Sequence, residues 1–174
     1  MSDAKTTDAF DRAVTANRGA LLSYFQRRLT NPADAAEAFG ELLLTAWRSR
    51  RRLPVEDDAA RMWLYGVARN VLRNAHRTLS RRSAAAQQFK DQLATAAAHV
   101  PDPLHEELRN AIASLSEDDA ELVRLVYWDG LPSHEAGQVI GINASTARSR
   151  LSKARKEIRA IIEPSNVTVG DRDV

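Results

Sequence analysis

The segment that most constrains the fold is residues 133–162, where a short helix and a long helix are predicted on either side of a glycine turn. Gly141 has no Cβ, so it suits the left-handed conformation that ends many helices. Asn143 has a side chain preferred at the N-cap of the following helix. Apolar residues then recur at spacings of three and four, on one face of the second helix: Ala147, Leu151, Ala154, Ile158 and Ile161.

The other side of this second helix is small and basic. Side chains opposite the apolar face are Ser145, Ser149, Lys153 and Lys156, and Arg148 and Arg150 flank them. Arg and Lys bind phosphates and guanine edges, and Ser and Thr bind either. The pattern is typical of a helix-turn-helix whose second helix enters the DNA major groove, although a solvated basic helix on an ordinary bundle is the alternative. The predicted DNA-binding residues are Ser145, Thr146, Arg148, Ser149, Arg150 and Lys153.

Composition places the whole chain in the all-α class. Its 174 residues suffice for one domain or two small ones, and they include only 7 Gly, 6 Pro and no alternating β-branched runs. The absence of Cys excludes disulfides and thiolate metal sites. No apolar run has transmembrane length, and the N-terminus lacks the apolar core of a signal peptide. We therefore expect a soluble cytoplasmic protein without membrane insertion.

Charge is distributed in blocks along the chain. Residues 48–90 contain 11 Lys and Arg against 3 acidic residues, residues 91–129 contain 2 against 9, and residues 130–163 contain 6 against 3. Two basic segments separated by an acidic one indicate two separate contacts with a polyanion.

Three helices are predicted before the acidic block, over residues 10–29, 32–48 and 59–80, and residues 1–9 are expected to be disordered. Asn31-Pro32 separates the first two, because proline disfavours helix in the residue before it. We expect the second helix to bury Trp47 in the core. Its acidic face is either solvated or docks a basic partner, and consists of Asp34, Glu37 and Glu41.

The third helix and the loop before it carry a dense arginine face. Such a face, interleaved with the aromatic residues Trp63 and Tyr65, suits phosphates and unstacked bases, although Trp63 is also expected to be a core anchor. The predicted strand-binding residues are Arg50, Arg51, Arg61, Trp63, Asn70, Arg73 and Arg77.

Residues 83–102 are predicted to form a linker, helical in part, because they are rich in Ala and Gln and end in prolines. Two further helices are predicted, over residues 104–115 and from Ser116 to Asp129-Gly130, and these must bury the apolar face of the helix-turn-helix. Residues 164–174 are expected to be an unstructured tail.

Three segments together resemble bacterial sigma factors of the small, extracytoplasmic-function (ECF) type. Residues 34–47 (DAAEAFGELLLTAW) are similar to the family's core-polymerase-binding helix. Residues 63–74 (WLYGVARNVLRN) are similar to its promoter-melting helix, and residues 131–155 to its upstream-element reader. A helix-turn-helix alone is weak evidence, but the three segments occur in the family's order.

The resemblance implies two helical domains joined by a flexible linker. Residues 1–82 would form sigma domain 2, which binds the polymerase and reads and melts the minus-10 element, and residues 103–163 would form sigma domain 4, which reads the minus-35 element as duplex. Implied partners are the β′ clamp of core RNA polymerase, promoter DNA and, as in many family members, an anti-sigma factor. The residues implied to bind polymerase are Asp34, Glu37, Glu41, Leu44 and Trp47.

The chain departs from the family pattern at several positions. Gly40 stands where Gln is usual, which removes a polar side chain from the polymerase-binding face. Gly66 stands where Arg is common, and Asn74 where Asp is common. Small residues at Ala136, Gly137 and Ala147 replace larger ones, so we expect an under-filled core that costs about 1–3 kcal/mol in stability.

Other function classes fit less well. A stand-alone helix-turn-helix regulator would leave the arginine face of the third helix unexplained, and a protein-binding adaptor would show no salt-sensitive DNA binding. An enzyme is disfavoured because the four histidines are scattered, lack zinc-site spacing and accompany no glycine-rich phosphate loop: His76, His99, His105 and His134. We therefore predict no catalytic residue, metal, cofactor or small-molecule substrate.

Overall fold

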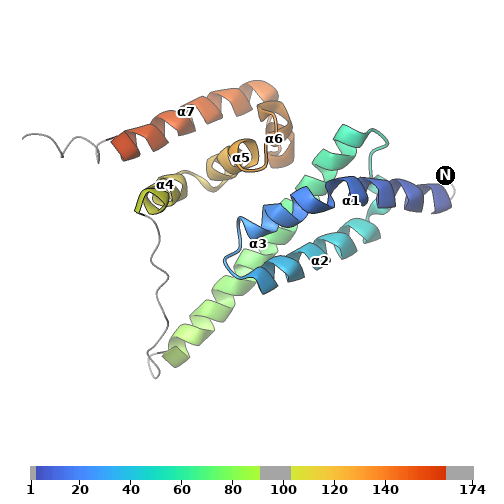
Figure 1. The fold of residues 1–174 in the computed structure, drawn as a ribbon, viewed down its shortest axis with the longest axis horizontal. Helices are drawn as coiled ribbons and strands as arrows, with labels where there is room; N and C mark the ends of the chain where they lie inside the picture. The colour runs from blue at the N-terminus through green and yellow to red at the C-terminus, as the bar shows by residue number, and fades with distance from the viewer. Residues whose placement is uncertain (1–2, 91–102, 164–174) are drawn as a thin grey trace, which may run out of the picture. The chain divides into compact units, whose positions relative to one another are not determined.

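The computed structural model describes residues 3–90 and 103–163, which are entirely helical apart from turns (Figure 1). The chain divides into two compact units, Met1–Ala96 and Ala97–Val174. The first unit contains α1 (Asp3–Gln26), α2 (Pro32–Arg48), a 3-10 turn η1 (Arg50–Arg52) and α3 (Asp57–Lys90). The second contains α4 (Pro103–Ala113), α5 (Glu117–Tyr127), α6 (Ser133–Ile140) and α7 (Ala144–Ile162). The all-α prediction is confirmed.

Each of the three helices in the first unit packs against the other two around an aromatic centre. Tyr24 and Tyr65 are fully buried and meet edge to face, with ring centroids 5.7 Å apart. Leu21, Leu42 and Leu64 complete the same core, one from each helix. Such aromatic pairs stabilise a core beyond the area that they bury.

The predicted helix boundaries are right where a local signal marks them. α2 spans the predicted residues, because the Asn31 side chain accepts a hydrogen bond from the Ala33 N–H at 2.9 Å and Pro32 follows it. α1 begins seven residues earlier than predicted, at Asp3, and Thr6 near its start is buried. The expectation of disorder over residues 1–9 is therefore wrong for the described residues from Asp3 onward. Tertiary packing overrides the weak helix propensity of this polar stretch.

α3 is longer than predicted at its C-terminal end. It continues to Lys90, because the alanines at 84–86 are strong helix formers. The first part of the predicted linker is therefore helical. The remainder of that linker up to residue 102, and the predicted tail, lie outside the described residues.

The second unit buries one face of α7 against α4 and α5. Its core includes Ile112 and Leu115 around α4, Ala120 and Val123 of α5, and Ala154 of α7. The partly buried side chains packed against this core are Trp128, Leu151 and Ile158. The prediction that these two helices cover the helix-turn-helix is confirmed.

The turn between α6 and α7 has the predicted conformation. Gly141 has φ +85° and ends α6, and the Ile142 N–H donates to the Gly137 carbonyl at 2.9 Å. The Asn143 side chain then accepts a hydrogen bond from the Thr146 N–H at 2.8 Å, as an N-cap. These two local devices fix the direction in which α7 leaves the turn.

The core of the helix-turn-helix was expected to be under-filled, and at Gly137 it is not. A Cβ on Gly137 would lie 2.9 Å from the Ala147 Cβ and 3.1 Å from the Ile142 carbonyl oxygen. Ala136 and Ala147 are themselves fully buried. The small residues therefore allow α6 and α7 to approach closely, and at Gly137 they leave no space for a side chain.

Substituting Gly137→Ala is expected to destabilise α6 and α7 by about 1–3 kcal/mol, because the Ala147 Cβ cannot move without shifting α7, and the Ile142 carbonyl cannot move without shifting the turn. Gly19→Ala is the matched control, since Gly19 lies in α1 with nothing near its missing Cβ, and it should stabilise by about 0.5–1 kcal/mol. Native-state hydrogen exchange measures both effects, at the α6 and α7 amides for Gly137→Ala and at the α1 amides for the control. A stabilising Gly137→Ala would contradict close packing at this crossing.

Candidate nucleic-acid and polymerase interfaces

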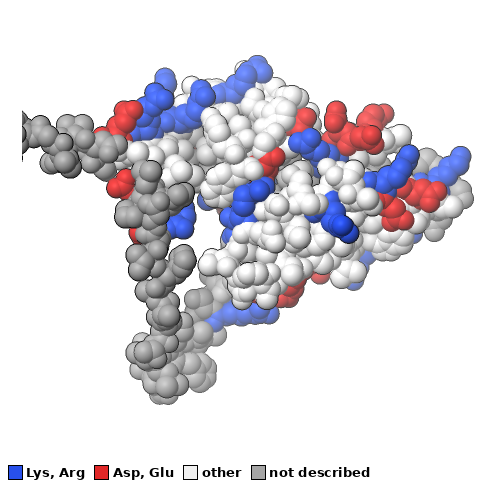
Figure 2. Space-filling view, in the orientation of Figure 1, with Lys and Arg blue, Asp and Glu red and all other residues white. Residues whose placement is uncertain are grey.

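The exposed face of α7 carries the predicted duplex-reading residues. Ser145, Arg148 and Ser149 are exposed, and Thr146 is half-buried next to the N-cap. Figure 2 shows Lys and Arg side chains gathered along α7. A helix that presents cations and small hydroxyls without bulky side chains matches what a major groove admits.

Arg150 differs from Arg148 in its surroundings. Its Nη1 atom lies 3.7 Å from Oδ1 of Asp119, and the pair links α7 to the first turn of α5. The other Asp119 oxygen accepts a hydrogen bond from the Ser116 hydroxyl at 2.8 Å, so the carboxylate is held in place. Lys153 is more exposed and forms an ion pair with Glu157 at 3.5 Å. Arg148 therefore points to solvent, whereas Arg150 also holds two helices together.

The predicted strand-binding residues of the first unit lie on α3 and on the loop before it. Asn70 and Arg77 are exposed on α3, and Arg61, Trp63 and Arg73 are half-buried. Trp63 is therefore not a fully buried core anchor. Tyr65, which was expected to help stack bases, is almost fully buried in the core and does not present its ring to a ligand.

The arginines of η1 are not equivalent. The Arg50 guanidinium stacks on the Trp47 ring, 4.1 Å from its centroid, and donates to the Trp47 carbonyl at 3.2 Å. Arg51 and Arg52 are exposed. Arg50 thus closes the end of α2, and its two neighbours are better placed to meet a phosphate. Arg52 was absent from the predicted site, although it belongs to the same basic run.

The prediction that Trp47 is buried in the core is wrong. Its side chain is 38% exposed rather than buried in the core, and its ring meets the buried Phe10 of α1 edge to face, with centroids 5.3 Å apart. Leu44, one turn earlier on α2, is 52% exposed. Leu44 and Trp47 thus form an exposed apolar pair on the helix that carries the acidic residues, and a partner that covered the pair would remove this apolar surface from water.

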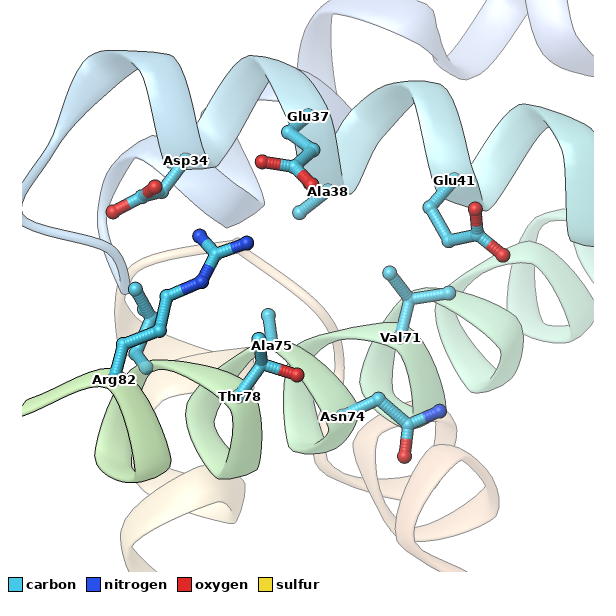
Figure 3. A pocket seen from close by; sticks show the side chains of 10 residues that line it. Asp34, Glu37, Ala38, Glu41, Val71, Asn74, Ala75, Thr78 and Arg82 are labelled. Carbon is cyan, nitrogen blue, oxygen red and sulfur yellow. The ribbon is translucent and has the colours of Figure 1, made fainter. Parts of the chain in front are cut away.

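A groove between α2 and α3 extends this α2 face (Figure 3). One wall is acidic and comes from α2, with Asp34, Glu37 and Glu41. The other wall comes from α3 and mixes apolar with polar side chains, and Figure 3 shows its Arg82 side chain reaching toward Asp34. The remaining lining residues are Ala38, Val71, Asn74, Ala75, Thr78 and Leu79. Sequence patterns placed the acidic wall on α2 but did not indicate that α3 completes a groove.

Family models match both units. The model of Sigma-70 region 2 matches residues 13–82, and the model of Sigma-70, region 4 matches residues 105–158. The chain belongs to the sigma-70 family. The two matches occur in the predicted order and together span most of the chain, and the relatives below identify this sigma factor as the ECF type.

The similar proteins are sigma factors. The "ECF RNA polymerase sigma factor SigL" of Mycobacterium tuberculosis is 29% identical over 166 residues, which cover 92% of this chain and 93% of the relative. The "Probable RNA polymerase sigma factor RfaY" of Xanthomonas campestris pv. campestris is 24% identical, over 87% of this chain and 40% of the relative. Sigma factors are non-catalytic initiation factors. The sigma factor described here binds RNA polymerase and promoter DNA to start transcription.

Solved structures share the fold. The sigma factor RpoE in complex with the anti-sigma factor NepR from Bartonella quintana has a TM-score of 0.60 and 19% identity, over 88% of this chain and 96% of that one. CnrH in complex with the cytosolic domain of CnrY has a TM-score of 0.63 and 18% identity, over 92% of this chain and 91% of that one.

Within residues 3–90 and 103–163 of the present sigma factor, no helix is long and apolar enough to span a membrane, and no cluster of three His, Asp or Glu residues could hold a metal ion.

Proposed function

We propose that this sigma factor reads the minus-35 element as duplex through α7 and the minus-10 element as melted strand through α3 and η1. The observation that carries the proposal is the presence of two basic helical faces in separate units. α7 belongs to a helix-turn-helix, which reads the major groove of a duplex. α3 combines arginines with a half-exposed tryptophan, which suits an opened strand. The proposed domain limits are 1–82 and 103–163, with a linker between them and a tail after residue 163.

Opening the minus-10 element requires bases to leave the stack, at a cost of a few kcal/mol. Contacts to the extruded strand offset that cost. Asn70, Arg73 and Arg77 are proposed to hold the strand, and Arg51 and Arg61 to contact it beside Trp63. We propose that Arg50 acts indirectly, because it is already stacked on Trp47 and so fixes the loop that carries Arg51.

The α2 face is proposed to dock the β′ clamp of core RNA polymerase. Its carboxylates at Asp34, Glu37 and Glu41 suit a basic partner, and the exposed Leu44 and Trp47 supply the apolar contact. In an interface of this composition the aromatic side chain is buried as an anchor at the centre, and the charged side chains lie at the rim.

An anti-sigma factor is a further proposed partner, and the cytoplasm is the proposed location. Among the solved structures that share the fold are the sigma factor RpoE in complex with the anti-sigma factor NepR and CnrH in complex with the cytosolic domain of CnrY, which supports this proposal. The exposed apolar residues of α2 would be available to such a protein when polymerase is absent.

Mapping transcription start sites tests the central proposal. The purified chain is mixed with sigma-free core RNA polymerase and fragmented genomic DNA from its host. Discrete starts preceded by two shared, spaced elements are expected. Salt-sensitive binding of the chain alone to palindromic duplex, without any starts, would instead indicate a stand-alone regulator.

Substituting Gly40→Gln should tighten binding to core polymerase about 2- to 12-fold, which corresponds to one added hydrogen bond. Gly40 lies on α2 between Glu37 and Glu41, and a Cβ there would meet nothing within 4 Å, so the fold accepts the larger residue. Gly19→Gln is the control, because it adds the same side chain at an open position of α1. Affinity is measured by fluorescence anisotropy with labelled protein. Equal affinities for both variants would remove Gly40 from the docking face.

A further inference from the structure

The C-terminal half of α7 has a basic hollow that lies outside the predicted reading residues. Its lining consists of Ser152, Arg155, Lys156 and Arg159. Ser152 is half-buried, and the three cations are exposed. Every lining side chain is a hydrogen-bond donor, and none is a carboxylate or an apolar residue. The hollow therefore has the composition of an anion site.

Two contacts near the hollow show how its cations are held. The Arg155 Nη1 atom donates to the Tyr127 hydroxyl at 3.4 Å, which ties this arginine to the end of α5. The Arg159 Nε atom lies 3.5 Å from a Glu163 carboxylate oxygen, and both side chains are about three-quarters exposed. An exposed ion pair of this kind is weak and can be exchanged for a phosphate.

The hollow continues the reading face along the same helix. At 100° per residue, Arg148, Ser152, Arg155 and Arg159 fall within a sector of about 60°. At 1.5 Å per residue, Arg155 lies about 10 Å beyond Arg148, and Arg159 about 16 Å beyond it. The major groove is about 12 Å wide. A helix whose first turns contact base edges thus brings the hollow to the phosphate backbone that borders the groove.

We propose that this hollow binds the DNA phosphate backbone beside the minus-35 element, and this proposal rests on the proposed duplex reading by α7. The contact would position α7 and add affinity without reading sequence. An acidic protein segment is a less fitting occupant, because protein interfaces are centred on apolar anchors and the hollow has none.

The experiment compares full-length variants by fluorescence anisotropy on two duplexes, one carrying the mapped minus-35 element and one with that element scrambled. Affinity is measured from about 50 to 200 mM salt. The triple variant R155Q/K156Q/R159Q should reduce the salt slope by about 0.9 for each lost phosphate contact, so by about 2–3 in total. It should weaken binding to both duplexes by the same factor.

Three controls keep the result interpretable. The variant K5Q/R12Q/R18Q removes three exposed cations from α1 and should leave the slope unchanged. R155K/R159K retains the charge and should also retain the slope. Circular dichroism shows whether each variant keeps its helices.

Two results would overturn the inference. An unchanged slope in the folded triple variant would leave the hollow to an acidic protein segment. A loss of discrimination between the two duplexes would assign these residues to base reading. If instead the unaltered chain showed no preference for the minus-35 duplex, the proposed function of α7 itself would fail, which is a distinguishable outcome.

Discussion

Replacing Arg148 by alanine should weaken binding to the minus-35 duplex by about 1–3 kcal/mol for each lost base contact, a rise in Kd of about 5- to 150-fold. Arg148 is exposed at the second turn of α7, next to the capped helix start. Because a base contact depends on sequence, the loss should be larger on the true element than on a scrambled one. Anisotropy titrations on both duplexes measure it.

Arg150→Ala separates reading from positioning. Arg150 is paired with Asp119, so its loss also removes a link between α7 and α5. If Arg150 only positions α7, Asp119→Asn should weaken binding about as much as Arg150→Ala, and the double variant should lose no more than either. If Arg150 contacts DNA, Asp119→Asn should instead leave binding intact. Unchanged binding in Arg148→Ala with Arg150→Ala would remove both residues from the reading role.

Replacing Asn70 and Arg73 together by alanine should spare duplex binding and reduce promoter opening about tenfold or more, since each hydrogen bond to a charged phosphate contributes about 1.5–3 kcal/mol. Both residues lie on the α3 face, and Asn70 is exposed. Permanganate reactivity of thymines in the minus-10 element, measured with holoenzyme, reports the open fraction.

An arginine and an asparagine that follow each other on α4 provide the matched control for this experiment. Arg109 and Asn110 are exposed on α4 in the other unit, so R109A/N110A removes the same side chains away from α3. Its thymine reactivity should equal that of the unaltered protein. Normal opening by the Asn70 and Arg73 variant would exclude this face of α3 from strand binding.

The features that sequence predicted well depend on contacts between near neighbours in the chain. The left-handed Gly141, the Asn143 cap and the start of α2 at Asn31-Pro32 each involve hydrogen bonds or backbone limits within a few residues. Short-range steric and hydrogen-bonding rules therefore suffice to place them. The basic face of α7 follows equally from helical periodicity once those ends are fixed.

The features that sequence missed depend on residues far apart in the chain. The Trp47 ring meets Phe10 of α1 edge to face and stays 38% exposed, and this contact between two helices does not follow from the pattern of α2 alone. α1 starts early because packing stabilises a polar stretch. The groove between α2 and α3 exists only once both helices are in place.

Sequence by itself determined the helical class, the order of the elements, the turn of the helix-turn-helix and the resemblance to sigma factors. Periodicity, caps and motifs each involve residues that are close together in the chain, so they can be recognised without the tertiary structure. Only the tertiary structure decided that Gly137 is required for close helix contact, and that Arg150 is paired with Asp119 while Arg148 is exposed. These properties depend on distances between side chains of different helices, and such distances are set by how the helices pack.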